Sequence, residues 1–363
     1  MPHDTSRGRT DPHPPRSSSS RPGRTARAGQ AHAGHAGRPA KGRPGPGRGA
    51  ARAAHGCDHR PDAPLGPDDP RGLGDYTLLG RLGEGGQGVV YLGRDGDGEL
   101  VTVKLLRGGV AAGQRARSRF VKEADAALRV SGRHTARVLD ADMTGDRPYI
   151  VSEFVEGPSL QDVVADRGPL SPPRLRKLAL RTAAALAAIH RAGIVHRDFK
   201  PGNVLLGPDG AKVIDFGIAR TADATPLTTG PVGTPAYMAP EQIEDEPVGP
   251  PADVFAWGAA MVFAATGRPP FGTGPSAAVM RRVTSRRPDL GDMEEGPLRE
   301  LAARCLDKNP AARPTASQIV RALREGQAPA PKPRPTRIPH YRWRMMVALG
   351  AVVAAGFLLG VLV

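Results

Sequence analysis

The chain has 363 residues, of which 51 are Lys or Arg and 36 are Asp or Glu, so its formal charge is +15. Its 46 glycines and 38 prolines, with only 4% aromatic residues, exclude one uniform globular body, because such composition buries too little apolar area to offset chain entropy. Two cysteines exclude a disulfide framework and a zinc site of the CxxC type.

The first segment, residues 1–74, contains 13 Lys or Arg, 6 Asp or Glu, and no Phe, Trp, Tyr, Ile or Val. Its prolines and glycines follow no period, so its composition predicts a disordered basic arm. Met1 is not followed by an apolar run, which excludes a secretory signal peptide. Residues 75–325 contain 33 basic and 30 acidic side chains, and this near balance predicts one ordinary soluble body.

From Leu78 to Leu106, apolar stretches alternate with glycine-rich turns, as is typical of an antiparallel meander. The GxGxxG motif at residues 83–88 is weak evidence alone, because dinucleotide-binding folds share it. In those folds a helix begins within the motif, whereas here residues 89–92 continue as a strand and residues 95–98 predict a hairpin turn. Two strands joined by glycines suit a loop over phosphates, although a plain glycine-rich hairpin remains an equal alternative on the motif alone.

Residues 101–104, Val-Thr-Val-Lys, have strand-like composition. A Lys that faces inward from a strand requires an anionic partner, because burying its charge alone is costly. Residues 117–130 have helical composition, and Glu123 lies among their apolar positions. We therefore expect an ion pair between Lys104 and Glu123 that holds the ammonium group ready for two phosphates.

Ser171 and Pro172 predict the start of a long helix, with an N-cap and a proline in the first turn, and Gly193 predicts its end. The sequence His-Arg-Asp-Phe-Lys-Pro-Gly-Asn follows at residues 196–203, and Asp-Phe-Gly follows a short apolar strand at residues 215–217. These two motifs contain three oxygen-bearing side chains of the kind that Mg²⁺ and a hydroxyl nucleophile require. They are Asp198, Asn203 and Asp215.

Three more motifs follow: Gly-Thr-Pro-Ala-Tyr-Met-Ala-Pro-Glu at residues 233–241, Asp-Val-Phe-Ala-Trp-Gly at residues 253–258, and Arg313 after an Asn-Pro pair. With these, the sequence resembles the bacterial eukaryotic-like Ser/Thr protein kinases from about Tyr76 to Leu323. The resemblance implies an α+β bilobal fold, with an antiparallel sheet and a helix in the N-lobe and a mainly helical C-lobe. Aminoglycoside-type phosphotransferases lack the Ala-Pro-Glu segment and are disfavoured.

The resemblance implies transfer of the ATP γ-phosphoryl group to Ser or Thr hydroxyls of proteins. Asp198 would accept the substrate hydroxyl proton, Lys200 would neutralise the transferring group, and Lys104, paired with Glu123, would bind the α- and β-phosphates. The residues implied to hold Mg²⁺ or Mn²⁺ are Asn203 and Asp215. The residues implied to bind ATP are Leu82, Gly83, Gly85, Gly88, Val90, Lys104, Glu153, Val155 and Leu205.

The resemblance also implies structural roles for Asp253 and for a buried ion pair between Glu241 and Arg313. Arg197, next to the catalytic carboxylate, would be a cation that faces the activation segment without an anion. Phosphorylation within residues 215–241 would supply that anion, so we expect activation by autophosphorylation. The candidate phosphosites are Thr228, which we expect first, Thr225 and Thr229. His196 is expected to be a structural prop and not a general base.

Residues 326–344 contain five basic and no acidic side chains, and residues 345–363 contain no charge. A helix of that uncharged run spans roughly 28 Å, about one bilayer core. With Tyr341 and Trp343 beside it, the pattern predicts a single transmembrane helix that keeps the kinase domain on the cytoplasmic side of the cell membrane. A buried core helix is disfavoured, because nothing polar interrupts the run. Since no residue follows Val363, we expect no external sensor domain in this chain.

Two alternatives to an active membrane-anchored kinase are considered. A pseudokinase scaffold is disfavoured, because every catalytic position is filled. The basic arm is compatible with binding to nucleic acid or anionic lipid, although a solvated tail is the simpler interpretation and a nucleic-acid partner is not expected. Gly356 and Gly360 form a GxxxG pattern compatible with a homodimer. The sequence does not identify the protein substrates.

Overall fold

A computed structural model of the protein describes residues 62–85, 88–106, 114–142, 147–216 and 235–326, all within the compact unit Cys57–Val363. Several predictions fall outside these residues: the arm up to residue 61, the linker from residue 327, the predicted span 345–363, and Thr225, Thr228 and Thr229. None of the helices in the described ranges is long and apolar enough to cross a membrane.

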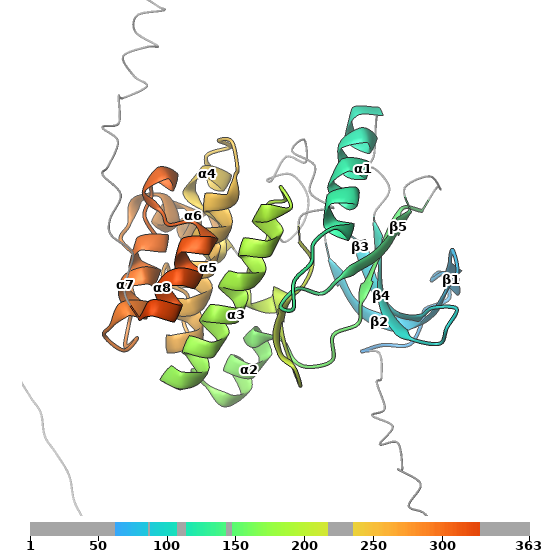
Figure 1. The fold of residues 1–363 in the computed structure, drawn as a ribbon, viewed down its shortest axis with the longest axis horizontal. Coiled ribbons are helices and arrows are strands. Elements are labelled where there is room, and N and C mark those ends of the chain that lie inside the picture. Colours follow the sequence, from blue (N-terminus) through green and yellow to red (C-terminus); the bar gives the residue numbers. More distant parts are fainter. Residues whose placement is uncertain (1–61, 86–87, 107–113, 143–146, 217–234, 327–363) are drawn as a thin grey trace, which may run out of the picture. The chain divides into compact units, whose positions relative to one another are not determined.

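The N-lobe consists of a six-stranded antiparallel sheet in the order β1-β2-β3-β4-β6-β5, with α1 beside it (Figure 1). Its elements are β1 (Gly72–Leu73), β2 (Tyr76–Gly85), β3 (Gly88–Arg94), β4 (Leu100–Leu106), α1 (Gln114–Leu128), β5 (Val138–Asp142) and β6 (Tyr149–Glu153). Strands β2 to β4 form the predicted meander, and Gly98 N donates to Asp95 O at 3.1 Å in the predicted hairpin turn. The fold class of the N-lobe is thus confirmed.

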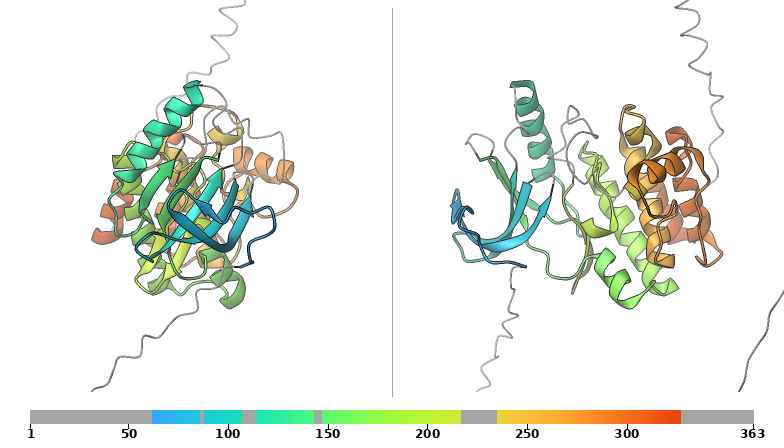
Figure 2. Two further views of the ribbon diagram at one scale, coloured as in Figure 1. Left: turned by 90° about the vertical axis from the view of Figure 1, so that its right-hand side faces the viewer. Right: turned by 180° about the vertical axis from the view of Figure 1, so that it is seen from behind.

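The C-lobe is mainly helical and includes one small antiparallel hairpin of β7 and β8. Its elements are α2 (Leu160–Arg167), α3 (Pro172–Arg191), the 3₁₀ turn η1 (Pro201–Asn203), β7 (Val204–Gly207), β8 (Gly210–Val213), the 3₁₀ turn η2 (Pro235–Tyr237), α4 (Pro240–Ile243), α5 (Pro250–Thr266), α6 (Ser276–Ser285), α7 (Pro297–Cys305), the 3₁₀ turn η3 (Pro310–Ala312) and α8 (Ala316–Glu325). In Figure 1 and the rear view of Figure 2, α3 lies between the sheet and the later helices.

The core of the C-lobe is built around α5, which is apolar on almost all sides. Its residues from Ala252 to Val262 are all buried, and Trp257 is completely inaccessible to solvent. A helix that is hydrophobic all round is stable only when other elements surround it. Helices α3 and α7 pack against α5, and Trp257 Nε1 donates to Thr182 Oγ1 of α3 at 2.9 Å.

Helix α3 begins and ends where its local sequence signals predict. Pro172 is its first residue, where the missing amide hydrogen is not needed. Ser171 occupies the N-cap, but its side chain makes no capping hydrogen bond. Gly193 follows the helix with a positive φ of 80°, which favours glycine. Five residues at helical spacing along α3 are all buried, namely Leu175, Leu178, Thr182, Leu186 and Ile189.

The folded body extends on the N-terminal side of the expected boundary at residue 74. Strand β1 pairs with β2, and Leu73 is buried against Leu78 and Tyr91. Asp69 is also buried, although its segment has the composition of the disordered arm. The composition of residues 1–74 hides this folded stretch, because two leucines and one aspartate add little to the average, whereas tertiary contacts decide whether a segment folds.

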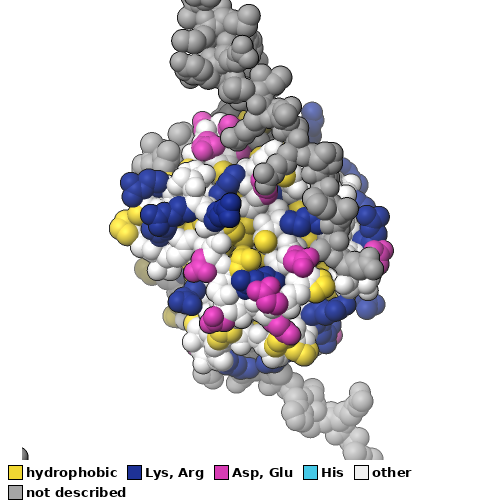
Figure 3. Space-filling model, turned by 90° about the vertical axis from the view of Figure 1, so that its left-hand side faces the viewer, with side chains coloured by type: hydrophobic (Ala, Val, Ile, Leu, Met, Phe, Trp, Pro, Cys, Tyr) yellow, Lys and Arg dark blue, Asp and Glu magenta, His cyan; other side chains and the backbone are white. Residues whose placement is uncertain are grey.

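The surface of the helical end of the molecule has a mixed charge. Figure 3 shows Lys and Arg side chains interspersed with Asp and Glu over this face. This mixture agrees with the near balance of 33 basic and 30 acidic side chains in residues 75–325.

Candidate active site

The loop between α3 and β7 brings three predicted site residues into one hydrogen-bonded cluster. Lys200 Nζ donates to Asp198 Oδ2 at 2.9 Å. Asn203 Nδ2 donates to the same oxygen at 3.3 Å and to the Asp198 carbonyl oxygen at 2.8 Å. The 3₁₀ turn Pro201–Asn203 returns the chain toward Asp198, so the amide of Asn203 reaches it. Asp198 is therefore a half-buried carboxylate whose orientation is fixed by two donors.

A buried carboxylate on α5 positions the backbone of this loop. Asp253 Oδ2 accepts a hydrogen bond from His196 N at 2.8 Å, and Asp253 Oδ1 accepts one from Arg197 N at 2.8 Å. His190 Nε2 of α3 lies 2.7 Å from Asp253 Oδ2. Arg197 has a positive φ of 61°, which is costly for a non-glycine residue and persists only where surrounding contacts impose it. These contacts agree with the structural role expected for Asp253.

The ring of His196 is buried beneath the loop and supports it. Its Nε2 lies 3.1 Å from the carbonyl oxygen of Ile214, which identifies this nitrogen as the donor. The ring packs edge-on against Phe199 and Phe216. Burial lowers the pKa of His196, although the nearby carboxylates of Asp253 and Asp198 act in the opposite direction. A neutral, fully buried imidazole fits the expected role of a prop.

Lys104 and Asp215 form an ion pair that links the two lobes. Lys104 lies on β4, and its Nζ is 3.2 Å from Asp215 Oδ2, just beyond β8. Asp215 has a positive φ of 58°, so its backbone, like that of Arg197, is held in a conformation that few non-glycine residues adopt. The pair brings the side chain expected to bind phosphates next to one expected to bind metal.

The ion pairs given for Lys104 and Glu123 reach two other residues, and the expected Lys104–Glu123 pair stays a prediction. Lys104 pairs with Asp215, whereas Glu123 Oε1 of α1 lies 3.6 Å from Arg197 Nη1. The expectation that Arg197 lacks an anion is therefore wrong, because Glu123 already provides one. The sequence could not reveal the Glu123–Arg197 contact, since it depends on where α1 lies against the C-lobe.

The glycine-rich motif joins β2 and β3 as expected. Gly83 pairs with Val90, and Gly85 pairs with Gly88. A β-carbon at Gly88, where φ is 153°, would collide with the carbonyl oxygen of Leu105, so this position requires glycine. Gly83 and Gly85 face open space, which leaves their backbone accessible to a ligand.

The other residues expected to contact ATP surround β4 and the connection between the lobes. Val90 is directly opposite Lys104 in the β3–β4 ladder. Leu82 and Leu205 are half-buried, and Val155 is buried. Glu153 differs, because its carboxylate forms ion pairs with Lys212 and Arg137. Any contact between Glu153 and ATP is therefore left to its backbone.

The donor set near Asp198 fits a divalent cation that is held largely by phosphates and water. Within the described ranges, no group of three or more His, Cys, Asp or Glu residues could enclose a metal ion. Magnesium usually keeps several waters and takes one or two protein carboxylates with substrate phosphates, so such a cage is not needed. Asn203 uses its amide nitrogen on Asp198, which leaves its Oδ1 as an oxygen donor for a cation.

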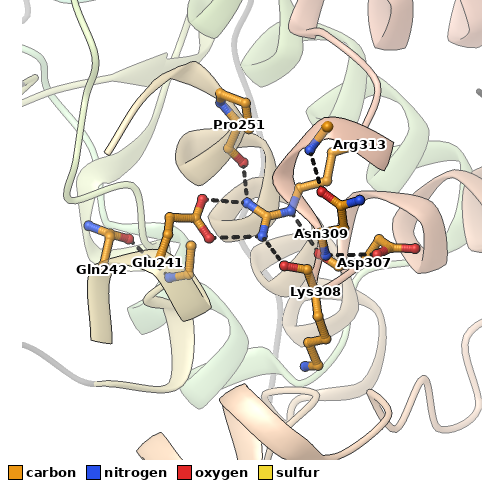
Figure 4. Close-up of polar contacts among 9 residues, drawn as sticks. Glu241, Gln242, Pro251, Asp307, Lys308, Asn309 and Arg313 are labelled. Carbon is orange, nitrogen blue, oxygen red and sulfur yellow. Dashed lines mark hydrogen bonds and ion pairs between the residues drawn. The ribbon is translucent and has the colours of Figure 1, made fainter. Parts of the chain in front are cut away.

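The expected Glu241–Arg313 pair is buried and bidentate (Figure 4). Arg313 Nη1 lies 2.6 Å from Glu241 Oε1, and Nη2 lies 2.9 Å from Oε2. The remaining guanidinium hydrogens are donated to the carbonyl oxygens of Pro251, Asp307 and Lys308. A buried guanidinium is stable only when its hydrogens are satisfied in this way.

Two positioning residues were not predicted from the sequence. Gln242 Nε2 of α4 donates to the carbonyl oxygen of Arg197 at 3.0 Å, so α4 supports the catalytic loop. Asp69 accepts hydrogen bonds from Arg81, Tyr91 and the amide of Gly66, and thereby anchors β2 just before the glycine-rich motif. For Gln242, its position next to the Ala-Pro-Glu segment was the available signal.

Comparisons with known proteins agree with this geometry. A family model described as Protein kinase domain matches residues 76–323. The chain is 45% identical over 262 residues to the probable serine/threonine-protein kinase PkwA of Thermomonospora curvata. This match covers 72% of this chain and 35% of that protein. It is 44% identical over 255 residues to the serine/threonine-protein kinase AfsK of Streptomyces coelicolor. This match covers 69% of this chain and 32% of that protein.

A solved structure gives the same result. The chain is similar to the PknI kinase domain of Mycobacterium tuberculosis, with a TM-score of 0.57 and 26% identity, over 70% of this chain and 97% of that one. The match covers only 35% of PkwA and 32% of AfsK, so the chain spans about a third of the length of these two curated relatives.

Proposed function

The chain belongs to the bacterial eukaryotic-like Ser/Thr protein kinase family, and on that premise we propose that it transfers the γ-phosphoryl group of ATP to Ser and Thr hydroxyls of proteins. One observation supports this activity above the others: Asp198 is oriented by both Lys200 and Asn203 within one loop. A carboxylate held in this way suits the positioning of a hydroxyl nucleophile, and phosphoryl transfer depends mainly on positioning and charge stabilisation.

Each residue then has a defined task. Asp198 accepts the proton of the substrate hydroxyl and orients the oxygen for in-line attack. Lys200 is 2.9 Å from the same carboxylate and neutralises the transferring group. Lys104 leaves Asp215 for the α- and β-phosphates, which the amides of Gly83, Gly85 and Gly88 cover. Asn203 and Asp215 are the residues that would hold a divalent metal ion, Mg²⁺ or Mn²⁺, which would neutralise phosphate charge.

The Glu123–Arg197 pair suggests how the activity is regulated. Both side chains are about a quarter exposed, so a stronger anion can reach Arg197. A phosphothreonine in the activation segment carries about two negative charges and competes with Glu123 for this guanidinium. Autophosphorylation at Thr228, Thr225 or Thr229 therefore activates the enzyme.

Incubation of the purified full chain with Mg-ATP, followed by phosphosite mapping, tests the activity. We expect phosphate on Ser or Thr of the chain and of a general protein substrate, and none with the Asp198→Asn variant. A catalytically inactive scaffold would give no phosphate in either sample. A variant with Thr225, Thr228 and Thr229 all replaced by Ala tests regulation, and full activity of this variant would rule out the proposed switch.

Residues 345–363 and the basic linker before them support a location at the cell membrane, with the kinase domain in the cytoplasm. The GxxxG pattern of Gly356 and Gly360 supports a homodimer through this segment. A dimer favours autophosphorylation between two copies. Loss of self-association in a Gly356→Ile, Gly360→Ile variant would support this assembly, and unchanged self-association would refute it.

A further inference from the structure

A groove of about 700 Å³ lies apart from the catalytic loop, between the turn after α1, helix α3, the β7–β8 hairpin and the end of α8. Its walls carry far more basic than acidic side chains. The basic residues are Arg133, Arg137, Lys177, Arg181, Lys212 and Arg324, and the acidic residues are Glu153 and Asp209. We call this surface the basic groove.

The acidic residues of the basic groove do not neutralise it. Glu153 is shared between Lys212 and Arg137, so one carboxylate serves two cations. Arg181 Nη1 donates to the carbonyl oxygen of Asp209 at 2.8 Å and not to its carboxylate. The basic groove therefore keeps a clear excess of positive charge after its internal pairs are counted.

Three of the cations are available to a ligand. Arg133, Lys177 and Arg324 are exposed, and their side chains form no hydrogen bond or ion pair with any residue that the structure describes. They come from the turn after α1, from α3 and from α8, so they line different walls of the basic groove. Packing of α8 against α3, with Arg176 Nη2 bound to the Leu323 carbonyl oxygen at 2.8 Å, fixes Arg324 near Lys177.

The positive charge of the basic groove affects the pKa of a histidine within it. The pKa of His134 is lowered first by burial and then by the charges of Arg181, Arg133 and Lys212. Cations from the turn, from α3 and from β8 thus all lower the pKa of the same imidazole. His134 is neutral at pH 7, so the positive potential of the basic groove comes from Lys and Arg alone and is present across the physiological pH range.

The shape and lining of the basic groove distinguish among anionic ligands. Its lining includes the apolar side chains of Leu180 and Ala184, which suit a ligand that has apolar as well as anionic groups. No aromatic residue appears among the described lining residues, whereas sites for single-stranded nucleic acid use aromatic stacking. A bilayer surface is flat and does not enter a groove. A free phosphate is much smaller than this space.

We propose that the basic groove is a docking site for an acidic polypeptide segment of a partner protein, one in which Asp and Glu side chains alternate with apolar residues. The acidic side chains contact Arg133, Lys177 and Arg324, and the apolar side chains contact Leu180 and Ala184. Complementary charge at such a surface determines which partner binds and how fast it associates. This binding is separate from phosphoryl transfer and does not depend on the activity proposed above.

The test measures binding of a fluorescein-labelled copolymer of Glu and Leu to the full chain in detergent, by fluorescence anisotropy. The variant Lys177→Glu, Arg324→Glu reverses two exposed cations of the basic groove. The matched control is Arg286→Glu, Arg287→Glu, which makes the same change in net charge at two exposed arginines outside the basic groove. The control also accounts for the basic arm and linker, which both variants retain.

We expect the groove variant to lose affinity by about tenfold or more, a difference of about 1.4 kcal/mol in binding free energy, while the control stays close to wild type. Equal loss in both variants would show that overall charge binds the copolymer and would overturn the proposal. A loss of binding to a DNA oligonucleotide or to phosphatidylglycerol vesicles, without a loss for the copolymer, would also overturn it and assign the groove to phosphates. If the charge reversal unfolds the protein, Lys177→Gln, Arg324→Gln gives the same comparison with a smaller expected effect.

A second measurement locates the ligand. An acidic segment in the basic groove adds negative charge close to His134, so the pKa of His134 should rise when the copolymer is added to the wild type. NMR titration of the histidine ring protons, assigned with a His134→Gln variant, measures this change. An unchanged pKa of His134 at saturating copolymer would contradict docking in the groove.

Discussion

Single buried carboxylates determine the local geometry of the active site. Asp253 binds two backbone amides of the catalytic loop, and Glu241 neutralises Arg313 beneath the neighbouring segment. Each is almost inaccessible to solvent, with exposures of 1% and 3%. A buried charge that loses its partner keeps its desolvation cost, so substitutions at such positions are more damaging than at exposed ion pairs.

The Glu241→Ala variant should lose about 3–5 kcal/mol of unfolding free energy, because it leaves the Arg313 guanidinium buried without its carboxylate. Urea denaturation monitored by circular dichroism measures this value. The control is Glu295→Ala, which removes an exposed partner of Arg299 and should cost no more than about 1 kcal/mol. Similar losses in the two variants would contradict the assignment of Glu241 and Arg313 as a structural pair.

His196 should make stability depend on pH. Its folded pKa lies below the ordinary value of 6.5, so the unfolded chain binds this proton more readily than the folded chain. The contribution is present in full above pH 6.5 and is lost as the pH falls from there through the folded pKa. The unfolding free energy should therefore fall between pH 7 and pH 5.5.

A His196→Asn variant tests this assignment, because its amide does not titrate and can donate to the same carbonyl oxygen of Ile214. Its unfolding free energy, measured by urea denaturation over the same pH range, should fall less steeply than that of the wild type. Parallel pH dependences in the two proteins would assign the effect to other groups.

At the scale of secondary-structure elements, the segment before β2 contributes contacts to the fold that its composition does not predict. Residues 62–74 include β1 and bring Asp69 into a buried cluster with Arg81 and Tyr91. Tyr91 OH donates to Asp69 Oδ1 at 2.7 Å, and Arg81 Nε donates to Oδ2 at 2.7 Å. This segment therefore holds β2 at the base of the glycine-rich motif and packs against the kinase domain.

Two truncations should behave differently. Removal of residues 1–61 should leave the unfolding free energy unchanged. Removal of residues 1–74 should lower it by about 2 kcal/mol or more, since burying one Leu side chain such as Leu73 contributes about that much. Thermal and urea denaturation of both truncated chains provide the comparison. Equal stability of the two truncated chains would show that residues 62–74 do not contribute to the fold. The variant Asp69→Asn tests the buried cluster of this segment by a single substitution in the full chain.

At the scale of the whole chain, the charge is divided unevenly between its segments. Residues 1–74 and 326–344 contribute most of the formal charge of +15, while residues 75–325 contain 33 basic and 30 acidic side chains. A basic stretch directly before an apolar run suits the cytoplasmic face of a membrane. The overall charge thus gives little support to nucleic-acid binding by the kinase domain.

The full chain expressed in bacteria should pellet with the membrane fraction and require detergent for extraction, because residues 345–363 form an uncharged run of the length of a bilayer core. A chain that ends at Gly326 should be found in the supernatant. Immunoblotting of fractionated cells, with a carbonate wash to remove proteins bound only by charge, makes the measurement. Release of the full chain by carbonate would contradict a transmembrane anchor.

The sequence by itself determined the features that depend on local signals. The glycine-rich meander follows from alternating apolar residues and turns, and α3 follows from Pro172, Gly193 and helical periodicity. The catalytic motif, from Asp198 to Asn203, lies within a few residues, and the resemblance to protein kinases implied the roles of its side chains. The order of these motifs was enough to predict the fold.

Only the tertiary structure decided which distant groups meet. Lys104 and Asp215 are 111 residues apart, and their ion pair depends on how the two lobes approach each other. For the same reason Glu123 pairs with Arg197, Gln242 supports the catalytic loop, and the walls of the basic groove come together from separate elements. Local patterns specify elements because their signals are short-range, whereas the choice among several nearby opposite charges is made by packing, which no short stretch of sequence encodes.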